Sequence, residues 1–240
     1  MREYSRRGFS VNHKGRTDLV TEADVACERA IIETIRASYP NHAVVAEEGG
    51  QSGESSCRWI IDPIDGTTNF AHGFPVYCAS IGFEREGQVA AGAVYDPTRG
   101  EMFTATRGGG AFLNGEAIAV SAVAALERSL LATGFPYAIR DEVENNLSHF
   151  ANFAMRAQAI RRPGAAALDL CYVACGRLDG FWEFHLKPWD MAAGALIVEE
   201  AGGRVTGVRG EPFSMYQPHI LASNGRIHGE MLSTLHVAAK

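Results

Sequence analysis

Two aspartates, Asp62 and Asp65, stand three positions apart in the octapeptide Asp-Pro-Ile-Asp-Gly-Thr-Thr-Asn, which spans residues 62–69. Pro63 fixes its own φ and stiffens the turn between them. Both carboxylates can then point at one centre while the carbonyl of Ile64 faces the same way. Carboxylate and carbonyl oxygens are the ligands that hard cations such as Mg²⁺ prefer. The first half of the octapeptide therefore predicts a cation site.

The second half of the octapeptide offers a place for an anion. Gly66 allows the backbone to come close to a ligand. The N–H groups of Gly66, Thr67 and Thr68 open a helical turn, and such a terminus binds phosphate well. An ordinary Asp-Pro turn before a capped helix would explain Asp-Pro-x-Asp alone. The complete octapeptide after a buried strand favours a joint cation and phosphate site.

Further carboxylates stand where the same centre could use them. Glu47 follows the apolar run at 43–46, and Asp190 lies at the start of an apolar helix. A cap or first-turn residue that offsets the helix dipole is an equally good interpretation of Asp190. Asp18 and Asp24 can each be plain helix-start residues. These positions are candidates, and the spacing alone does not choose among the interpretations.

Composition restricts the class of protein. The chain has 240 residues, 46% of them hydrophobic and 21% charged, and a net charge of −6. Disorder is not expected. A nucleic-acid-binding face is not expected either, because the one basic stretch is the N-terminal run from Arg2 to Arg16. Five cysteines match no zinc spacing and are expected to be reduced thiols. No apolar run suits a membrane span or a signal peptide, so a cytoplasmic protein is predicted.

The elements that must position these residues follow from the hydrophobic pattern. Thr21 can cap a helix over 22–38 that Pro40 ends. Further helices are expected over 142–157, 165–175 and 189–201, with a last one from near Asn224. Strands are expected over 43–46, 58–61, 76–85, 88–95, 101–106, 129–133, 160–162, 180–184 and 219–222.

The interleaving of helices and strands predicts a layered α/β fold. The N-terminal half reads as an antiparallel sheet and the C-terminal half as a mixed one. We expect two subdomains in one folding unit. Residues 1–125 would carry most cation ligands, and residues 126–240 would carry the substrate contacts and Asp190.

Together, these motifs resemble the inositol monophosphatase family. The resemblance rests on Lys14–Asp24, Glu47-Glu48, the octapeptide and Trp189–Gly194, and continues through Arg107–Gly115 and Glu199–Gly203. It covers nearly the whole chain from Lys14 onward. It implies a Mg²⁺-dependent, Li⁺-sensitive phosphatase of α-β-α-β-α sandwich type that forms a homodimer. It also implies that the helix which usually precedes the Lys14 segment is missing or cut short.

The resemblance also assigns roles at matching positions. Glu47, Asp62 and the Ile64 carbonyl would hold one Mg²⁺, and Asp62, Asp65 and Asp190 a second. A weaker third ion would lean on Glu47. Thr67, with Glu47 or Asp24, would orient the attacking water. The N–H groups of Gly66 and Thr67 would hold the phosphate next to Asp65.

Substrate contacts are implied at Gly164, Ala166 and Glu183, where the family binds the hydroxyl-bearing ring. Ala165 departs from members that carry threonine there, which would shift substrate choice. The expected substrate is a small phosphorylated polyol or sugar, by default inositol 1-phosphate. Fructose 1,6-bisphosphatase and histidinol-phosphate phosphatase activities are the alternatives within the class. A regulatory protein that keeps the fold without turnover is the alternative outside it.

Overall fold

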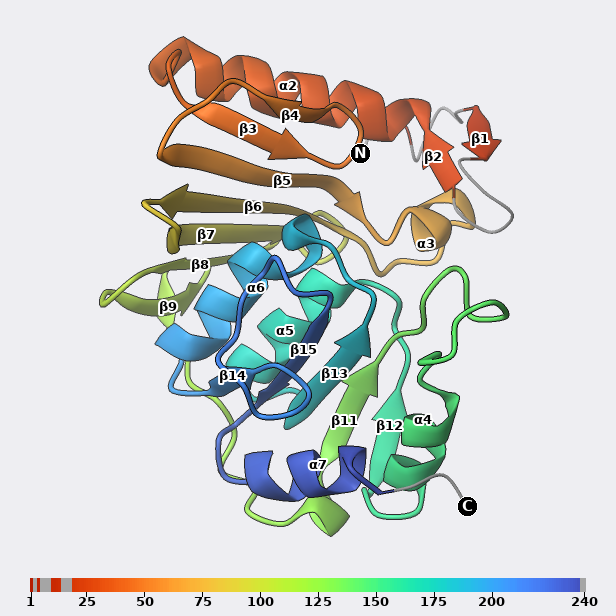
Figure 1. Cartoon of the computed structure of the whole chain (residues 1–240). Helices are drawn as coiled ribbons and strands as arrows, with labels where there is room; N and C mark the ends of the chain where they lie inside the picture. Colours follow the sequence, from red (N-terminus) through yellow and green to blue (C-terminus); the bar gives the residue numbers. More distant parts are fainter. Residues whose placement is uncertain (2–3, 5–9, 14–18, 238–240) are drawn as a thin grey trace.

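The computed structural model describes residues 1, 4, 10–13 and 19–237. Its elements form five layers: a helix, a large sheet, a helical layer, a smaller sheet and an outer helical layer (Figure 1). The predicted layered α/β fold of sandwich type is confirmed. Among the described residues, no helix combines the length and the apolar character that a membrane span requires.

The larger sheet has eight strands in the described chain, and its middle strands form the expected meander. The strand at 43–46 pairs parallel with the strand at 57–65, and every other neighbouring pair is antiparallel. The larger sheet is therefore mixed. The spatial order is β10 (Glu116–Ala117), β9 (Gly110–Leu113), β8 (Glu101–Thr106), β7 (Gln88–Asp96), β6 (Cys78–Arg85), β5 (Cys57–Asp65), β3 (Ala43–Ala46), β4 (Gly50–Ser52).

Helix α2 (Glu22–Ser38) covers one face of this sheet. It begins where the sequence predicted, because the Thr21 hydroxyl accepts from the N–H of Ala23 and the Asp24 carboxylate accepts from the N–H of Thr21. Its apolar side, including Ile35, packs against Ala46 and Ile61. Before it, β1 (Val11–His13) and β2 (Leu19–Thr21) form an antiparallel pair.

The central layer consists of α5 (Ala166–Ala174) and α6 (Pro188–Glu200). Both helices are almost entirely apolar and small-residue-rich, so both of their faces are buried, one against each sheet. They share one core with Phe103 of the larger sheet and Phe181 of the smaller one. The N-termini of both helices reach the edge where β5 ends (Figure 1).

The smaller sheet is mixed, as predicted. Phe153, Trp182 and Met231 fill the space between it and the outer helices. In spatial order, its strands are β12 (Ala159–Arg161), β11 (Leu130–Thr133), β13 (Gly180–Phe184), β15 (His219–Ser223) and β14 (Arg204–Thr206). The outer helices are α4 (Leu147–Ala154) and α7 (His228–Leu235), and η1 (Leu126–Arg128) precedes β11.

Three sequence expectations were wrong in their bounds. The helix expected over 142–157 begins only at Leu147, because Asn146 has φ +70° and its buried side chain is committed to tertiary hydrogen bonds. The last helix begins at His228, because the Asn224 side chain accepts from two following N–H groups and forms a turn. The strand expected to stop at Ile61 continues through Asp65. Four short strands were not predicted, because they have too few residues to show an alternation of apolar and polar side chains: β4, β9, β10 and β14.

Candidate active site

Strand β5 presents Asp62 and Asp65 through a bulge. Residues three apart in a regular strand point to opposite faces. Here Asp62 pairs with Ser80 and Asp65 with Cys78, so three steps along β5 oppose two along β6. The extra residue is accommodated around Pro63, which has no N–H to give to the ladder. Both aspartates therefore face the same side, as the sequence interpretation required.

Asp65 joins the two halves of the molecule. Its carboxylate accepts from the N–H of Ala166 at 3.2 Å and of Ala167 at 2.7 Å, which are the first two residues of α5. A carboxylate at a helix N-terminus satisfies N–H groups that lack an intrahelical acceptor. The site therefore lies at the junction between the end of β5 and the start of α5.

Gly66 lets the two segments approach each other. It has φ +92°, and an added Cβ would lie 2.9 Å from the Val76 carbonyl oxygen and 3.3 Å from that of Gly164. The Asn69 side chain donates to the Pro163 carbonyl oxygen at 2.8 Å and completes the contact. A helical turn, α3 (Thr67–Ala71), begins directly after Gly66.

The Thr67 hydroxyl lies between two acceptors. It is 3.1 Å from Asp24 Oδ1 and 2.9 Å from the Ile64 carbonyl oxygen. Asp24 is fully buried and its other oxygen accepts from the N–H and the hydroxyl of Thr21. The start of α2 therefore fixes the orientation of Thr67, and Asp24 acts at once as a helix cap and as its partner.

Glu47 and Asp190 reach the same edge from two other elements. Glu47 follows β3, and its N–H donates to the Ile61 carbonyl oxygen at 3.2 Å, which ties the turn to β5. Asp190 lies in the first turn of α6 and accepts from the N–H of Lys187 at 2.7 Å. The two interpretations of Asp190 are thus compatible, since it caps α6 and also lines the pocket described below.

The electrostatics show that these acids form one group, which we call the acidic edge: Asp24, Glu47, Asp62, Asp65 and Asp190. Burial raises the pKa of Asp62 well above its usual value, and the other four carboxylates add to that rise. Burial likewise raises the pKa of Asp65 to about 6, although N–H groups of α5 oppose the shift. It raises that of Asp190 to about 7, with Asp65 as the next contributor.

The acidic edge fits a hard cation by its chemistry. Buried carboxylates that disfavour each other's charge gain most from a positive ion, and Mg²⁺ selects carboxylate oxygens. In the described residues, no three His, Cys, Asp or Glu side chains already surround one point as metal ligands do. The hydrogen bonds explain this, because Asp62, Asp65 and Asp190 each accept from a backbone N–H.

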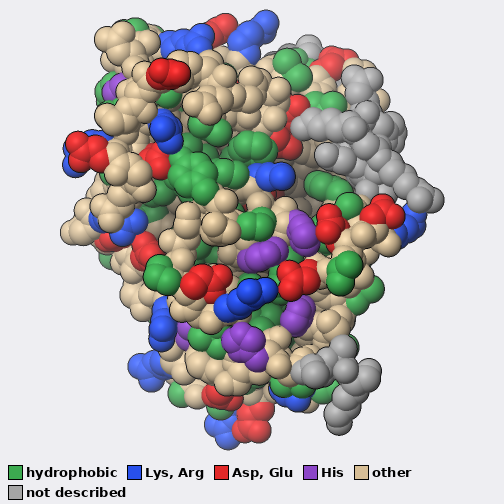
Figure 2. Space-filling model, viewed as in Figure 1, with side chains coloured by type: hydrophobic (Ala, Val, Ile, Leu, Met, Phe, Trp, Pro, Cys, Tyr) green, Lys and Arg blue, Asp and Glu red, His purple; other side chains and the backbone are tan. Residues whose placement is uncertain are grey.

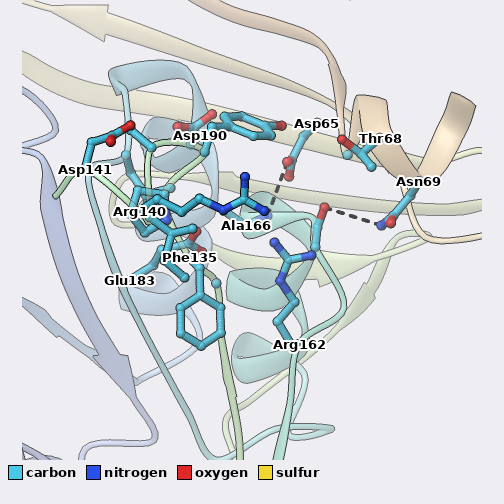
Figure 3. A pocket seen from close by; sticks show the side chains of 18 residues that line it. Asp65, Thr68, Asn69, Phe135, Arg140, Asp141, Arg162, Ala166, Glu183 and Asp190 are labelled. Atoms are coloured by element: carbon cyan, nitrogen blue, oxygen red, sulfur yellow. Dashed lines mark hydrogen bonds between the residues drawn. The ribbon is translucent and has the colours of Figure 1, made fainter. Parts of the chain in front are cut away.

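A pocket of about 630 Å³ opens beside the acidic edge (Figure 3). Gly66 and Thr68 line one end and Glu183 lies on the opposite wall. Glu183 is half-buried at the end of β13 and packs against Gly134, where an added Cβ would collide with its carboxylate. Burial raises the pKa of Glu183, and Asp190 and Asp65 raise it further. The structure thus brings Gly66, Gly164, Ala166 and Glu183 together at one pocket.

The outer wall of the pocket is a segment that we call the pocket loop, residues 134–146. Its base is closed by Asn146, whose amide donates to the Thr133 hydroxyl and the Gly134 carbonyl oxygen and accepts from the Trp182 indole. His185 and His219 face Glu142 and Glu144 of the loop at 3.9 Å. Figure 2 shows histidines gathered among acidic and basic side chains on this face.

The sequence analysis did not identify several residues that line the pocket. Phe135, Arg140 and Arg162 line the pocket, although no motif in the chain marks them. It also missed Asp169, which is buried in α5 with one carboxylate oxygen lacking a hydrogen bond. Burial raises the pKa of Asp169 and nearby Glu183 adds to the shift. Asp18, the remaining acid considered from sequence, lies outside the described residues.

Comparisons with known proteins agree with this geometry. The model of the inositol monophosphatase family matches residues 1–239. The phosphatase IMPL1 of Arabidopsis thaliana chloroplasts is 46% identical over 96% of this chain, which spans 64% of that protein's length. An inositol-1-monophosphatase of Synechocystis is 48% identical, with 94% of this chain and 79% of that protein covered. The Nus factor SuhB of Pseudomonas aeruginosa is 47% identical, with 95% and 86% covered.

Solved structures show the same likeness. An inositol monophosphatase from Anabaena superposes with a TM-score of 0.89 at 44% identity, covering 90% of this chain and 87% of that one. A staphylococcal inositol monophosphatase complexed with products gives 0.87 at 27% identity, with 99% and 90% covered. A LiCl-soaked inhibitory complex of a staphylococcal enzyme gives 0.86 at 26% identity, with 98% and 88% covered.

Proposed function

This chain belongs to the inositol monophosphatase family, and we propose that it hydrolyses small phosphate monoesters of polyols or sugars with Mg²⁺ as cofactor. Family membership confirms the class predicted from sequence, that of the phosphoric monoester hydrolases. The observation that carries the proposal is the pocket lined by Asp65, Asp190 and Gly66, whose two aspartates interact electrostatically with the other acids of the acidic edge. Inositol 1-phosphate is the reference substrate.

The acidic edge would hold the metal. Glu47, Asp62 and the Ile64 carbonyl would ligate one ion, and Asp62, Asp65 and Asp190 a second. Bound Mg²⁺ supplies Lewis acidity and lowers the pKa of water. Asp62 and Asp190 each accept a backbone N–H at one carboxylate oxygen, and the other oxygen keeps lone pairs for a metal.

Thr67 is the residue that would orient the attacking water. Its hydroxyl has one proton, which Asp24 or the Ile64 carbonyl oxygen accepts, so its lone pairs are left facing the site. The N–H groups of Gly66 and Thr67 begin a helical turn and would hold the phosphoryl oxygens. Phosphoryl transfer needs positioning and charge stabilisation more than a covalent nucleophile.

The substrate's hydroxyl groups would meet Gly164, Ala166 and Glu183. Glu183 reaches the pocket from the smaller sheet, opposite the phosphate cradle. An ionised carboxylate only accepts hydrogen bonds and therefore suits hydroxyl donors. Fructose 1,6-bisphosphate and histidinol phosphate are the alternative substrates, and the amine of histidinol phosphate could pair with Glu183.

A second candidate function is a regulatory one, because the relative from Pseudomonas aeruginosa is named a Nus factor. The two functions are compatible in one molecule. The buried acids favour retained catalysis, since a protein that only binds partners has no use for a row of carboxylates whose pKa values burial raises.

A steady-state assay tests the proposal. We expect phosphate release from at least one of inositol 1-phosphate, fructose 1,6-bisphosphate and histidinol phosphate when Mg²⁺ is added, and its loss with a chelator. Li⁺ at millimolar levels should inhibit, with KCl as the ionic-strength control. Full turnover in metal-free buffer would overturn the role of Mg²⁺. No turnover on any ester would overturn the proposed function and leave the regulatory candidate.

A further inference from the structure

The pocket extends well beyond the phosphate cradle, and two arginines lie in its outer part. Arg162 comes from the connection between β12 and α5, and Arg140 comes from the pocket loop. The two are far apart in the sequence, yet both side chains line the same pocket, and Arg162 lies beside Gly164 (Figure 3). A single phosphate at Gly66 leaves this end of the 630 Å³ space to another part of the substrate.

Neither guanidinium is committed to the protein. Within the described residues, no carboxylate lies within 4.0 Å of the Arg140 or Arg162 guanidinium. Neither guanidinium donates a hydrogen bond to a described residue. Arg99 instead pairs with Asp96 at 2.8 Å and Arg177 with Glu101 at 2.6 Å. Arg140 and Arg162 differ from the other exposed arginines in lining the pocket, so their donors are available to a ligand bound there.

Both arginines are held by ordered backbone. Arg162 precedes Pro163 and Gly164, whose carbonyl oxygens the Asn69 amide contacts at 2.8 and 3.4 Å. Arg140 belongs to the loop whose base Asn146 closes. The pocket thus presents the guanidinium groups of Arg140 and Arg162 together with the carboxylates of Asp65, Asp141, Glu183 and Asp190.

We propose that Arg140 and Arg162 bind a second anionic group of the substrate, so that the preferred substrates are phosphate monoesters that also carry a phosphate or carboxylate at the far end. This inference rests on the proposed function. A guanidinium presents a planar fork of donors that matches both kinds of anion. It would also offset the repulsion that a second anion meets from Glu183 and Asp190.

A simpler role competes with this one. The arginines could merely neutralise the acidic pocket, since Arg162 lies close enough to lower the pKa of Glu183 and Asp169. In that case their removal would affect every substrate to the same extent. The proposal instead requires that the effect depend on the second anion, which makes the two roles separable.

The experiment compares kcat/KM for inositol 1-phosphate, fructose 1,6-bisphosphate and 3-phosphoglycerate in the wild type, Arg162→Gln, Arg140→Gln and the double variant. Arg161→Gln is the matched control, because Arg161 is exposed, adjacent and absent from the pocket lining, with its guanidinium on the Ile160 carbonyl oxygen. Because hydrogen bonds to charged groups are lost, we expect the double variant to lose about 10- to 100-fold on substrates with a second anion. Inositol 1-phosphate and the control should change less than about threefold.

The three substrates also separate the sources of the second anion. A loss on the bisphosphate alone assigns the wall to phosphate, and a loss on 3-phosphoglycerate alone assigns it to carboxylate. Equal losses on all three substrates, or none on any, would overturn the inference. Wild-type hydrolysis of inositol 1-phosphate alone would overturn it and leave the proposed function intact. No hydrolysis of any ester would instead overturn the proposed function.

Discussion

The acidic edge and the pocket loop border the same cavity but are built in opposite ways. Four of the acids lie on β5 or at helix starts, where backbone N–H groups fix their carboxylates, and the fifth, Glu47, follows β3. Asp24 and Asp62 are buried. The pocket loop has exposed side chains, such as Tyr137, and Asn146 ties its base to two strands. Under the proposed function, chemistry would therefore rest on regular elements, and recognition would rest partly on a surface loop.

This difference teaches where a change should matter. A substitution at the acidic edge should slow every substrate, because all share the same phosphoryl group. A substitution at the wall should change the ranking of substrates instead. Glu183 lies between these regions, on a strand but next to Gly134 of the loop, and so provides the most informative test.

The largest effect is expected for Asp190→Asn. The change keeps the size and the cap on α6 but removes a charge that a second metal needs. Removing one preorganised electrostatic group costs about 100-fold or more in kcat. Turnover on inositol 1-phosphate and on an aryl phosphate should fall together, with an unchanged circular dichroism spectrum. A fall of less than about tenfold with a normal spectrum would make Asp190 only a helix cap.

Glu183→Gln should give a smaller and selective effect. Loss of hydrogen bonds to a charged acceptor should lower kcat/KM for a polyol phosphate by about 1.5–3 kcal/mol. An aryl phosphate, which has no ring hydroxyls, should be nearly unaffected. Kinetics on the two substrates check this, and the assignment would be falsified if both losses were equal or neither occurred.

The pocket loop can be tested through its base. Asn146→Ala leaves the Trp182 indole without its acceptor and places alanine at a positive φ. We expect the free energy of unfolding to drop by about 2–4 kcal/mol. Urea denaturation measures it, with Asn145→Ala as the neighbouring control, since Asn145 makes only an exposed contact to the N–H of Leu147. An equal drop in both variants would show that Asn146 does not anchor the loop.

The smallest effect is expected on the stability of the protein at low pH. It should arise at a histidine outside both the acidic edge and the pocket loop. His228 is fully buried between the hydroxyls of Thr206 and Ser223, and burial lowers its pKa to about 4. Below about pH 6.5, His228 is protonated in the unfolded chain but stays neutral in the folded protein. Its contribution to the free energy of unfolding is therefore full at neutral pH and fades as the pH falls toward 4. The slope is at most about 1.4 kcal/mol per pH unit.

The measurement is the difference in unfolding free energy between wild type and His228→Gln at pH 5 and pH 7. The difference isolates His228, because the raised pKa values of Asp65 and Asp190 act in the opposite sense and are common to both proteins. We expect the wild-type advantage to shrink on acidification. An advantage that stays constant would place the acid sensitivity at groups other than His228.

Local sequence determined much of this protein. Thr21 and Asp24 fixed the start of α2, since a capping box acts within one turn. The octapeptide placed two aspartates at the end of a strand directly before a helical turn, and the alternation of elements predicted the layers. These features depend on neighbours in the chain, so the pattern of residues suffices to predict them.

Only the tertiary structure decided the rest. The bulge that turns Asp62 and Asp65 to one side depends on pairing with β6, and the start of α4 depends on hydrogen bonds from Asn146 to two strands. The meeting of Arg140 and Arg162 depends on how a loop and a connection lie across the pocket. A side chain's neighbours across space leave no period or spacing in the sequence, so the pocket wall to which we assign substrate choice could not be predicted from the sequence.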